Sequence, residues 1–288
     1  MHKLATQHLS GSGRLPVAAT IETLALSRAT HYRQQASLPQ PDPDTQLRDQ
    51  IQRIALDWPC YGYRRITAQL HRQGMTANHK RVLCLMREDN LLCLRKRRFI
   101  CTTDSTHGLS IYPNLVPDLT ISSINQLWVA DITYIRLLRE FLYLAVILDA
   151  YSRRCIGWAL ESYLEAGLAL EALRMALATR RVEPGLVHPS DRGVQYASSA
   201  YSELLKERGI RISMSRRGNP YDNAQAERFM RTLKYEEVYL FEYETQAEAR
   251  ARISHFLEEV YNQKRLHSAL GYVPPAEFEQ RVCQTTDA

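Results

Sequence analysis

Short β-rich runs separated by turn sequences dominate the chain after residue 120. The first three runs follow one another directly, at residues 128–135, 141–148 and 154–160. Strands in direct succession predict an antiparallel meander. Helices and short strands are then expected to alternate, at residues 164–180, 186–188, 199–208 and 210–214. The order β-β-β-α-β-α-β predicts an α/β fold built on a mixed sheet flanked by helices, with the second strand at the edge of the meander.

Two longer helices are expected beyond this region, at residues 222–239 and 244–261. The first carries apolar residues at the spacing of one buried helix face: Ala226, Phe229, Met230 and Leu233. This stripe predicts that the helix packs against the protein interior.

The N-terminal part has the pattern of a helix-turn-helix. Helices are expected at residues 45–56 and 64–72, with Gly74 ending the second, and Asn78 caps a third helix that runs through Arg87. On the third helix the apolar residues Val82, Leu85 and Met86 recur at the spacing of a buried face. The side chains left outward are those of His79, Lys80, Arg81 and Arg87, as a helix lying in a DNA groove requires.

These patterns divide the chain into four parts. We expect a short helical N-terminal segment at residues 1–40, a helix-turn-helix-like region at 41–105, a linker at 106–120, and an α/β domain with a C-terminal helix and tail at 121–288. The basic charge is concentrated near the N-terminus: residues 1–120 carry 16 Lys and Arg against 9 Asp and Glu, whereas residues 121–288 carry 21 against 22. A polyanion-binding module ahead of a near-neutral domain fits this split, although short arginine runs are also common on solvated surfaces.

Composition excludes several classes of protein. The chain is 45% hydrophobic and 24% charged, which is typical of globular proteins, and no run of about eighteen apolar residues is present. A soluble intracellular protein with six reduced cysteines is expected. A zinc site at His71, His79, Cys84 and Cys93 is disfavoured, because structural zinc ligands usually come in more closely spaced pairs.

Three acidic residues stand out in this pattern. Asp131 interrupts the first β-rich run, Asp191 follows the fourth strand, and Glu227 lies on the polar face of the helix at residues 222–239. That face also carries Asn223, Arg231 and Lys234. Three converging carboxylates repel one another unless a cation is bound, and oxygen ligands of this kind select Mg²⁺ or Mn²⁺.

Each acid also has an explanation that involves no chemistry. Asp131 would serve as an edge-strand charge, Asp191 as the first residue of a turn, and Glu227 as the partner of Arg231 on a helix surface. The spacing favours a site: 59 residues separate the first two acids, 35 separate the second and third, and Lys234 follows seven positions after Glu227.

The sequence resembles the transposases encoded by the larger open reading frame (OrfB) of IS3-family insertion sequences, which have the DDE catalytic core shared with retroviral integrases. Besides the three acids, the resemblance is carried by residues 128–134 (WVADITY), Asp149 with Ser152-Arg153 and Gly157-Trp158, residues 190–193 (SDRG) with Gln195-Tyr196, residues 213–215 (SMS), Gly218-Asn219 and Asp222-Asn223-Ala224. Further along, Tyr261-Asn262, Arg265 and residues 267–272 (HSALGY) match, and upstream Gly62-Tyr63-Arg64-Arg65-Ile66 and Lys80-Arg81-Val82 resemble the family's helix-turn-helix. Pro189 departs from the family pattern.

The resemblance implies an RNase H-like fold and a DNA strand-cutting and strand-joining enzyme. It implies that Asp131, Asp191 and Glu227 hold two Mg²⁺ (or Mn²⁺) ions and that Lys234 holds the terminal DNA phosphates. Further DNA contacts are expected from Arg231, Arg216, Arg217, Lys80, Arg81, Arg64 and Arg65. Asn223 and Gln195 would either orient the metal ligands or brace loops.

The family also implies partners and a location. We expect DNA at the element ends and in the target, a homo-oligomer on DNA, an upstream OrfA product as a possible partner, and a place in the bacterial cytoplasm with the nucleoid. Two alternatives remain: an inactive DNA-binding derivative of a transposase, and a metal-dependent nuclease on the same fold.

Overall fold

The computed structural model describes residues 22, 27–29, 43–92, 112–116, 119–190, 195–196, 198–214 and 223–286. By compactness the chain divides into a unit at Met1–Arg53 and a unit at Ile54–Ala288. Of the predicted helical segment at residues 1–40 the structure describes residues 22 and 27–29, and of the predicted linker at 106–120 it describes residues 112–116 and 119–120.

Helices form where the N-terminal pattern predicts them: α4 at Thr45–Asp57, α5 at Tyr63–Arg72 and α6 at His79–Glu88. The side chain of Asn78 accepts a hydrogen bond from the Lys80 amide at 2.8 Å, which caps α6. Gly74 has a φ of +82°, in the left-handed region that glycine adopts without a steric penalty, and this conformation ends the helix. The face of α6 formed by Val82, Leu85 and Met86 is buried, as expected.

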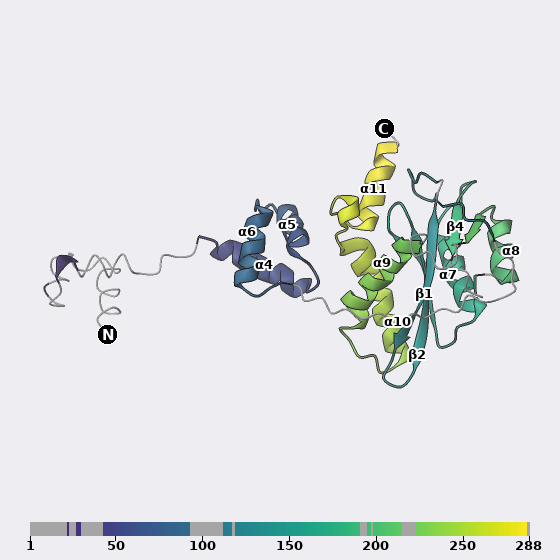
Figure 1. Ribbon diagram of the computed structural model, residues 1–288, viewed down its shortest axis with the longest axis horizontal. Coiled ribbons are helices and arrows are strands. Elements are labelled where there is room, and N and C mark those ends of the chain that lie inside the picture. The colour runs from purple at the N-terminus through teal and green to yellow at the C-terminus, as the bar shows by residue number, and fades with distance from the viewer. Residues whose placement is uncertain are drawn as a thin grey trace. The chain divides into compact units, whose positions relative to one another are not determined.

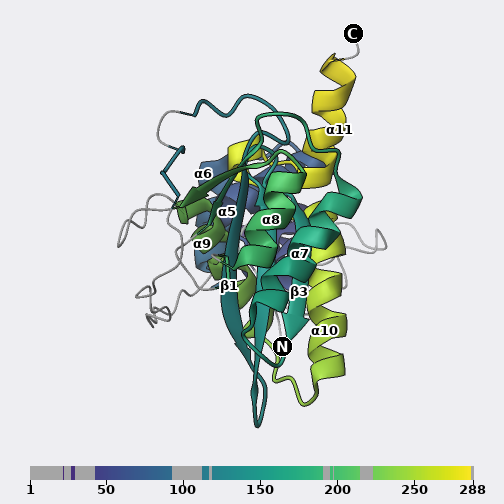
Figure 2. The ribbon, with the colours of Figure 1, turned by 90° about the vertical axis from the view of Figure 1, so that its right-hand side faces the viewer.

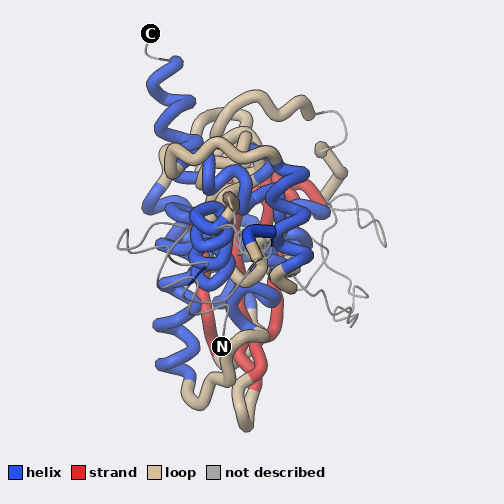
Figure 3. Tube along the Cα trace, turned by 90° about the vertical axis from the view of Figure 1, so that its left-hand side faces the viewer, coloured by secondary structure: helices blue, strands red, loops and turns tan. Residues whose placement is uncertain are grey.

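The meander forms the centre of the sheet. It consists of β1 (Trp128–Arg136), β2 (Phe141–Asp149) and β3 (Cys155–Glu161), which pair antiparallel in the order β1-β2-β3. The expectation that the second strand lies at the edge is wrong. Each strand of a meander pairs with its neighbours in sequence, so β2 is central, and it is buried along nearly its whole length. In Figure 3 the strands are seen partly hidden behind helices.

Two short parallel strands extend the sheet on the β1 side. They are β4 (Val187–Ser190) and β5 (Arg211–Met214). β4 joins β1 through a parallel bridge between Leu127 and Val187, and the Val187 amide donates to the Gln126 carbonyl at 2.9 Å. The strands therefore lie in the order β3-β2-β1-β4-β5.

Helices cover both faces of this sheet. On one face α7 (Ala166–Thr179) and α8 (Ser199–Glu207) pack on Trp128, Ala145 and Ile156. On the other face α9 (Ala224–Leu233) and α10 (Gln246–His255) pack on Val129, Leu144 and Leu148. Figure 1 shows the two helix pairs on opposite sides of β1 and β2, and Figure 2 shows α7 and α8 lying in front of the strands. Alternate residues of a strand point to opposite faces, so the meander separates two apolar cores.

The two long C-terminal helices are not α-helical throughout. α9 continues into a π-helical segment at Lys234–Val238, and α10 continues into another at Phe256–Lys264. The single helices predicted at 222–239 and 244–261 miss this change, although the buried stripe from Ala226 to Leu233 is confirmed. A short 3₁₀ turn at Ser268–Leu270 and a last helix, α11 at Pro275–Thr286, complete the described chain.

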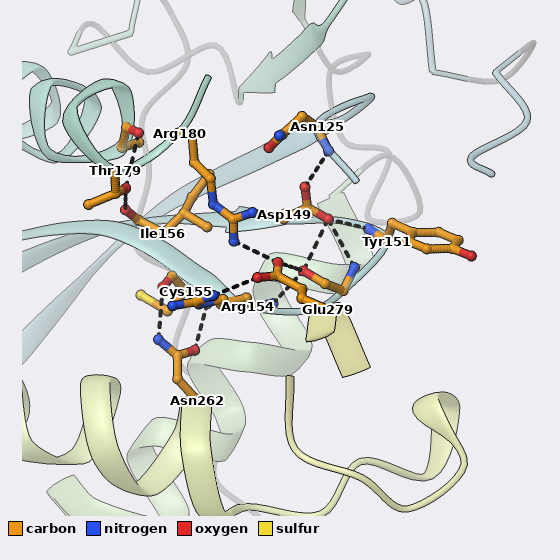
Figure 4. A network of polar contacts seen from close by, with 12 residues as sticks. Asn125, Asp149, Tyr151, Arg154, Cys155, Ile156, Thr179, Arg180, Asn262 and Glu279 are labelled. Atoms are coloured by element: carbon orange, nitrogen blue, oxygen red, sulfur yellow. Dashed lines mark hydrogen bonds and ion pairs between the residues drawn. The ribbon is translucent and has the colours of Figure 1, made fainter. Parts of the chain in front are cut away.

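A buried carboxylate attaches α11 to the turn between β2 and β3 (Figure 4). Glu279 accepts hydrogen bonds from Ser152 Oγ, Arg154 and Arg180, each at 2.6 Å. Asp149 organises the same turn by accepting from the amides of Asn125, Tyr151 and Ser152. In the described part of the chain no helix is both long and apolar enough to cross a bilayer.

Candidate active site

Asp131 lies on the face of β1 that α9 covers. It alternates with Val129 and Ile135, both part of the apolar core beneath α9, and it is half-buried. Its strand neighbour on the β2 side is Val146. On the other side β4 accompanies β1 only to the level of Ala130, because the parallel bridge aligns residue 187 with residue 127 and the strand ends at Ser190. Asp131 therefore lies one residue past the level at which the described part of β4 ends.

The N-terminal end of α9 is hydrogen-bonded to the backbone beside Asp131. Asn223, the residue before the helix, donates from Nδ2 to the Ala130 carbonyl at 3.1 Å. Its Oδ1 is buried and has no hydrogen-bond partner among the described residues. Glu227 lies one turn further along α9 and is exposed, whereas its neighbour Ala226 is buried. The structure thus places the helix of Glu227 against the strand of Asp131 (Figure 1).

Lys234 follows at the other end of α9 and contacts the same strand. Its Nζ lies 4.5 Å from the centroid of the Tyr134 ring, three residues after Asp131. Partial burial lowers the pKa of the ammonium group, and the nearby Asp131 carboxylate acts in the opposite direction. The Lys234 ammonium group has lost part of its hydration through burial, so binding an anionic group would be favourable. The face of the Tyr134 ring stabilises the cation in this position.

The remaining predicted site residues divide into two groups. Asp191, Arg216 and Arg217 lie outside the described residues. Gln195 donates from Nε2 to the Leu164 carbonyl at 3.5 Å, in the segment before α7. Arg231 is exposed, with its guanidinium 5.7 Å from the Tyr235 ring.

In the helix-turn-helix the predicted DNA-contacting side chains differ in exposure. Lys80, Arg81 and Arg64 are exposed. Arg65 is half-buried with its guanidinium 5.4 Å from the Tyr61 ring, and burial lowers its pKa. Of the four, Arg65 is therefore the side chain with the least access to a ligand.

Two residues near the site escaped the sequence prediction. Tyr134 is an aromatic residue three positions after Asp131, yet nothing in the sequence indicates that Lys234 reaches its ring. His188 is fully buried and bonded to β1. The sequence offers one indication of the His188 contact, namely Pro189. A proline inside a strand has no N–H, so a carbonyl of the neighbouring strand is left without its usual backbone donor.

The donors present fit a hard divalent cation. Asp131 offers a carboxylate, Glu227 an exposed carboxylate on the adjacent helix, and Asn223 an unpartnered amide oxygen at the same end of α9. Oxygen donors of this kind suit Mg²⁺ and Mn²⁺. Among the described residues no three acidic, histidine or cysteine side chains form a metal-binding group.

Comparison with known proteins places these features in a family. The chain matches the integrase core domain at residues 122–220 and again at 208–275, and an HTH-like domain at residues 42–99. Over 222 residues it is 38% identical to the transposase InsF for insertion sequence IS3A of Escherichia coli (strain K12), covering 77% of each chain. The chain belongs to the IS3-family transposases.

A second relative supports this membership. An insertion element IS600 31 kDa protein of Shigella sonnei is 39% identical over 225 residues, covering 78% of this chain and 83% of that protein. Among solved structures, the catalytic core domain of BIV integrase is 20% identical with a TM-score of 0.43, covering 57% of this chain and 99% of that one. The two sequence relatives confirm the expected family. The mixed α/β fold expected from the order of strands and helices is confirmed by the sheet described above.

Proposed function

We propose that this IS3-family protein cuts DNA at the ends of an insertion sequence and joins the freed ends to target DNA, using Mg²⁺ or Mn²⁺. The observation that carries the proposal is the bond from Asn223 to the Ala130 carbonyl, because it holds the helix of Glu227 against the strand of Asp131. Lys234 lies beside the same strand, where a DNA phosphate would meet its ammonium group.

Asp131, Asp191 and Glu227 are the residues proposed to hold two metal ions. The register of the sheet supports including Asp191. Trp128 and His188, which are bonded across β1 and β4, are 60 positions apart, and Asp131 and Asp191 are separated by the same 60 positions. The proposal therefore takes Asp191 to follow the same parallel register as Val187 and His188.

When bound, two divalent ions activate an attacking oxygen and stabilise a leaving oxygen during in-line displacement at phosphorus. The protein's own side chains would fix the geometry of that displacement. Asn223 holds the end of α9 on β1, and Lys234 would bind the phosphate next to the reacting bond. No serine, tyrosine or cysteine nucleophile is required, because water and then the freed 3′-hydroxyl would attack in turn.

The remaining basic side chains are proposed to bind the DNA backbone. Arg231 is exposed on the same helix as Glu227, and Arg216 and Arg217 precede that helix in sequence. Lys80, Arg81 and Arg64 project from the helix-turn-helix. Phosphate contacts of this kind give an affinity that falls steeply with salt. Arg65 is proposed to contribute only if it leaves the Tyr61 ring.

A strand-transfer assay tests the proposal. The chain is incubated with a pre-cut DNA end, a target plasmid and Mg²⁺, alone and with the upstream OrfA product. Joined product is expected. Degradation without joining would favour the nuclease, and binding without chemistry would favour the inactive derivative. We also propose that the protein assembles as a homo-oligomer on DNA and acts at the bacterial nucleoid. Sedimentation with and without DNA would test the assembly.

A further inference from the structure

The ladder between β1 and β4 lacks a donor at one defined position. The Val187 amide donates to the Gln126 carbonyl at 2.9 Å. In a parallel ladder the donors on one strand are alternate residues, so the next donor would be the amide of residue 189, aimed at the Trp128 carbonyl. Residue 189 is proline and has no N–H. The backbone of β4 therefore cannot complete this bond.

The side chain of His188 occupies the missing donor's place. Its Nδ1 lies 2.7 Å from the Trp128 carbonyl oxygen, and a carbonyl only accepts, so Nδ1 carries the proton. Its Nε2 lies 2.7 Å from the hydroxyl of Tyr201 on α8, which donates to it. His188 and Tyr201 are both buried, and burial lowers the pKa of His188 to about 4 and raises that of Tyr201. The neutral ring is thus held in one tautomer.

We infer that His188 is a positioning residue, whose side chain replaces the backbone donor that Pro189 lacks and fixes the register of β4 against β1. This inference rests on the proposed function, since β4 leads in sequence to Asp191 and β1 carries Asp131. A slip of one residue moves a strand by about 3.3 Å and turns its side chains to the other face of the sheet. Metal ligands tolerate errors of only about 0.2 Å, so a slipped strand would disable the site.

Restoring the backbone donor tests the inference directly. Four full-length proteins are compared: the wild type, His188→Leu, Pro189→Ala, and the double variant. Joining rate, Mn²⁺ affinity by titration calorimetry, and the Tm are measured on each. His188→Leu should lower the joining rate at least about tenfold, weaken Mn²⁺ binding about tenfold, and lower the Tm by about 3 °C, the shift that one lost bond typically gives in a chain this size.

The decisive result is the coupling between the two positions. Pro189→Ala should change the wild type less than about twofold, yet recover most of the joining rate and Mn²⁺ affinity in the His188→Leu background, because the alanine amide can reach the Trp128 carbonyl. Equal effects of Pro189→Ala in both backgrounds would overturn the inference, and so would a His188→Leu protein that matches the wild type. If His188→Leu does not fold, recovery of folding by Pro189→Ala supports the inference and its failure refutes it.

Two further variants separate this role from general packing and from the proposed function. His188→Asn keeps a donor near the position of Nδ1 and should retain more Mn²⁺ affinity than His188→Leu, whereas a packing role would rank the larger apolar leucine higher. Asp131→Asn serves as the reference for the metal site. If the wild type and Asp131→Asn bind Mn²⁺ equally and neither joins DNA, the proposed function fails. In that case the Tm values of the four proteins still show whether the His188 and Pro189 substitutions depend on each other, and so whether His188 replaces the missing backbone donor.

Discussion

The Nζ of Lys234 lies 4.5 Å from the centroid of the Tyr134 ring, on the strand that carries Asp131. The contact joins the C-terminal end of α9 to β1, as the Asn223 bond joins the N-terminal end. Glu227 lies between these two attachments. The helix is therefore fixed to the strand on both sides of its acidic residue, an arrangement that suits a site in which two carboxylates must keep a constant separation.

Replacement of Lys234 by alanine should weaken binding to DNA ends more than it slows chemistry at saturating DNA. Losing one phosphate contact should also reduce the slope of log affinity against log salt by about 1. Fluorescence anisotropy with a labelled end, measured over a salt series, checks both. An unchanged affinity and slope would remove Lys234 from the interface.

The Tyr134 ring should matter for its face and not for its hydroxyl. Tyr134→Phe keeps the aromatic face under Lys234 and should bind DNA ends within about twofold of the wild type. Tyr134→Leu removes it and should weaken binding about threefold to tenfold, the range expected for one partly desolvated cation–π contact. Equal binding by the two variants would argue against the contact.

Conservative changes of the acids should abolish joining while leaving DNA binding intact. Asp131→Asn, Asp191→Asn and Glu227→Gln each remove one charge from a group that acts as a unit, so each should lower strand transfer roughly a thousandfold or more. Gel-shift affinity is the control. A variant within tenfold of the parent would exclude that residue from the site.

Glu279→Ala should destabilise the protein by about 3 kcal/mol, because it leaves the half-buried charge of Arg180 and its neighbour Arg154 without their partner. The matched control is Glu171→Ala, which breaks the exposed pair with Arg174 and should change stability by less than about 1 kcal/mol. Urea unfolding of the two variants measures the difference.

Gly157→Ala should destabilise the sheet beneath α7. A Cβ at this position would lie 2.2 Å from the Ala172 carbonyl oxygen and 2.9 Å from the Ala176 nitrogen, so the helix must move. Overpacking of this kind costs about 3 kcal/mol. Gly167→Ala, in α7 itself, has open space around it and should leave stability unchanged or raise it by up to about 1 kcal/mol.

Acid should destabilise the fold through its buried imidazoles. Burial lowers the pKa of His188 from 6.5 to about 4, and burial with nearby arginines lowers that of His267 to about 2. Below pH 6.5 each unfolded imidazole binds a proton that the folded one excludes, so stability falls as the pH drops from 6.5 to about 4. The slope is about 1.4 kcal/mol per pH unit for each group. His188→Asn should remove one of the two slopes, as measured by urea unfolding over a pH series.

Much of this fold was predictable from local sequence. The meander strands at β1, β2 and β3 and the capped helix α6 carry dense local signals, namely β-rich runs and the Asn78 cap. The π-helical segment after Lys234 was not predictable, because its residues suit an ordinary helix equally well. The sequence does not predict α11, because this helix makes its contacts through a mixture of acidic and aromatic side chains, among them Glu279 and Phe278, which leaves no periodic apolar pattern.

The candidate site likewise contains residues that the sequence predicts and a contact that it does not predict. Asp131 is conspicuous in the sequence because it interrupts a β-rich run, and Asn223 because it shares a polar helix face with Glu227. The Lys234–Tyr134 contact escaped prediction, because it joins residues 100 positions apart and depends on how α9 lies along the strand. Distant pairs of this kind are fixed by packing, which a single sequence does not record.

The attachment of α11 by Glu279 sets the shortest catalytic fragment that is worth producing. Truncation at Gly271 would keep every strand and both helix layers, yet leave Ser152 and two arginines facing water where a carboxylate had been. A poor yield of such a fragment would then follow from the loss of the Glu279 carboxylate, and it would not show that the rest of the integrase core is unstable.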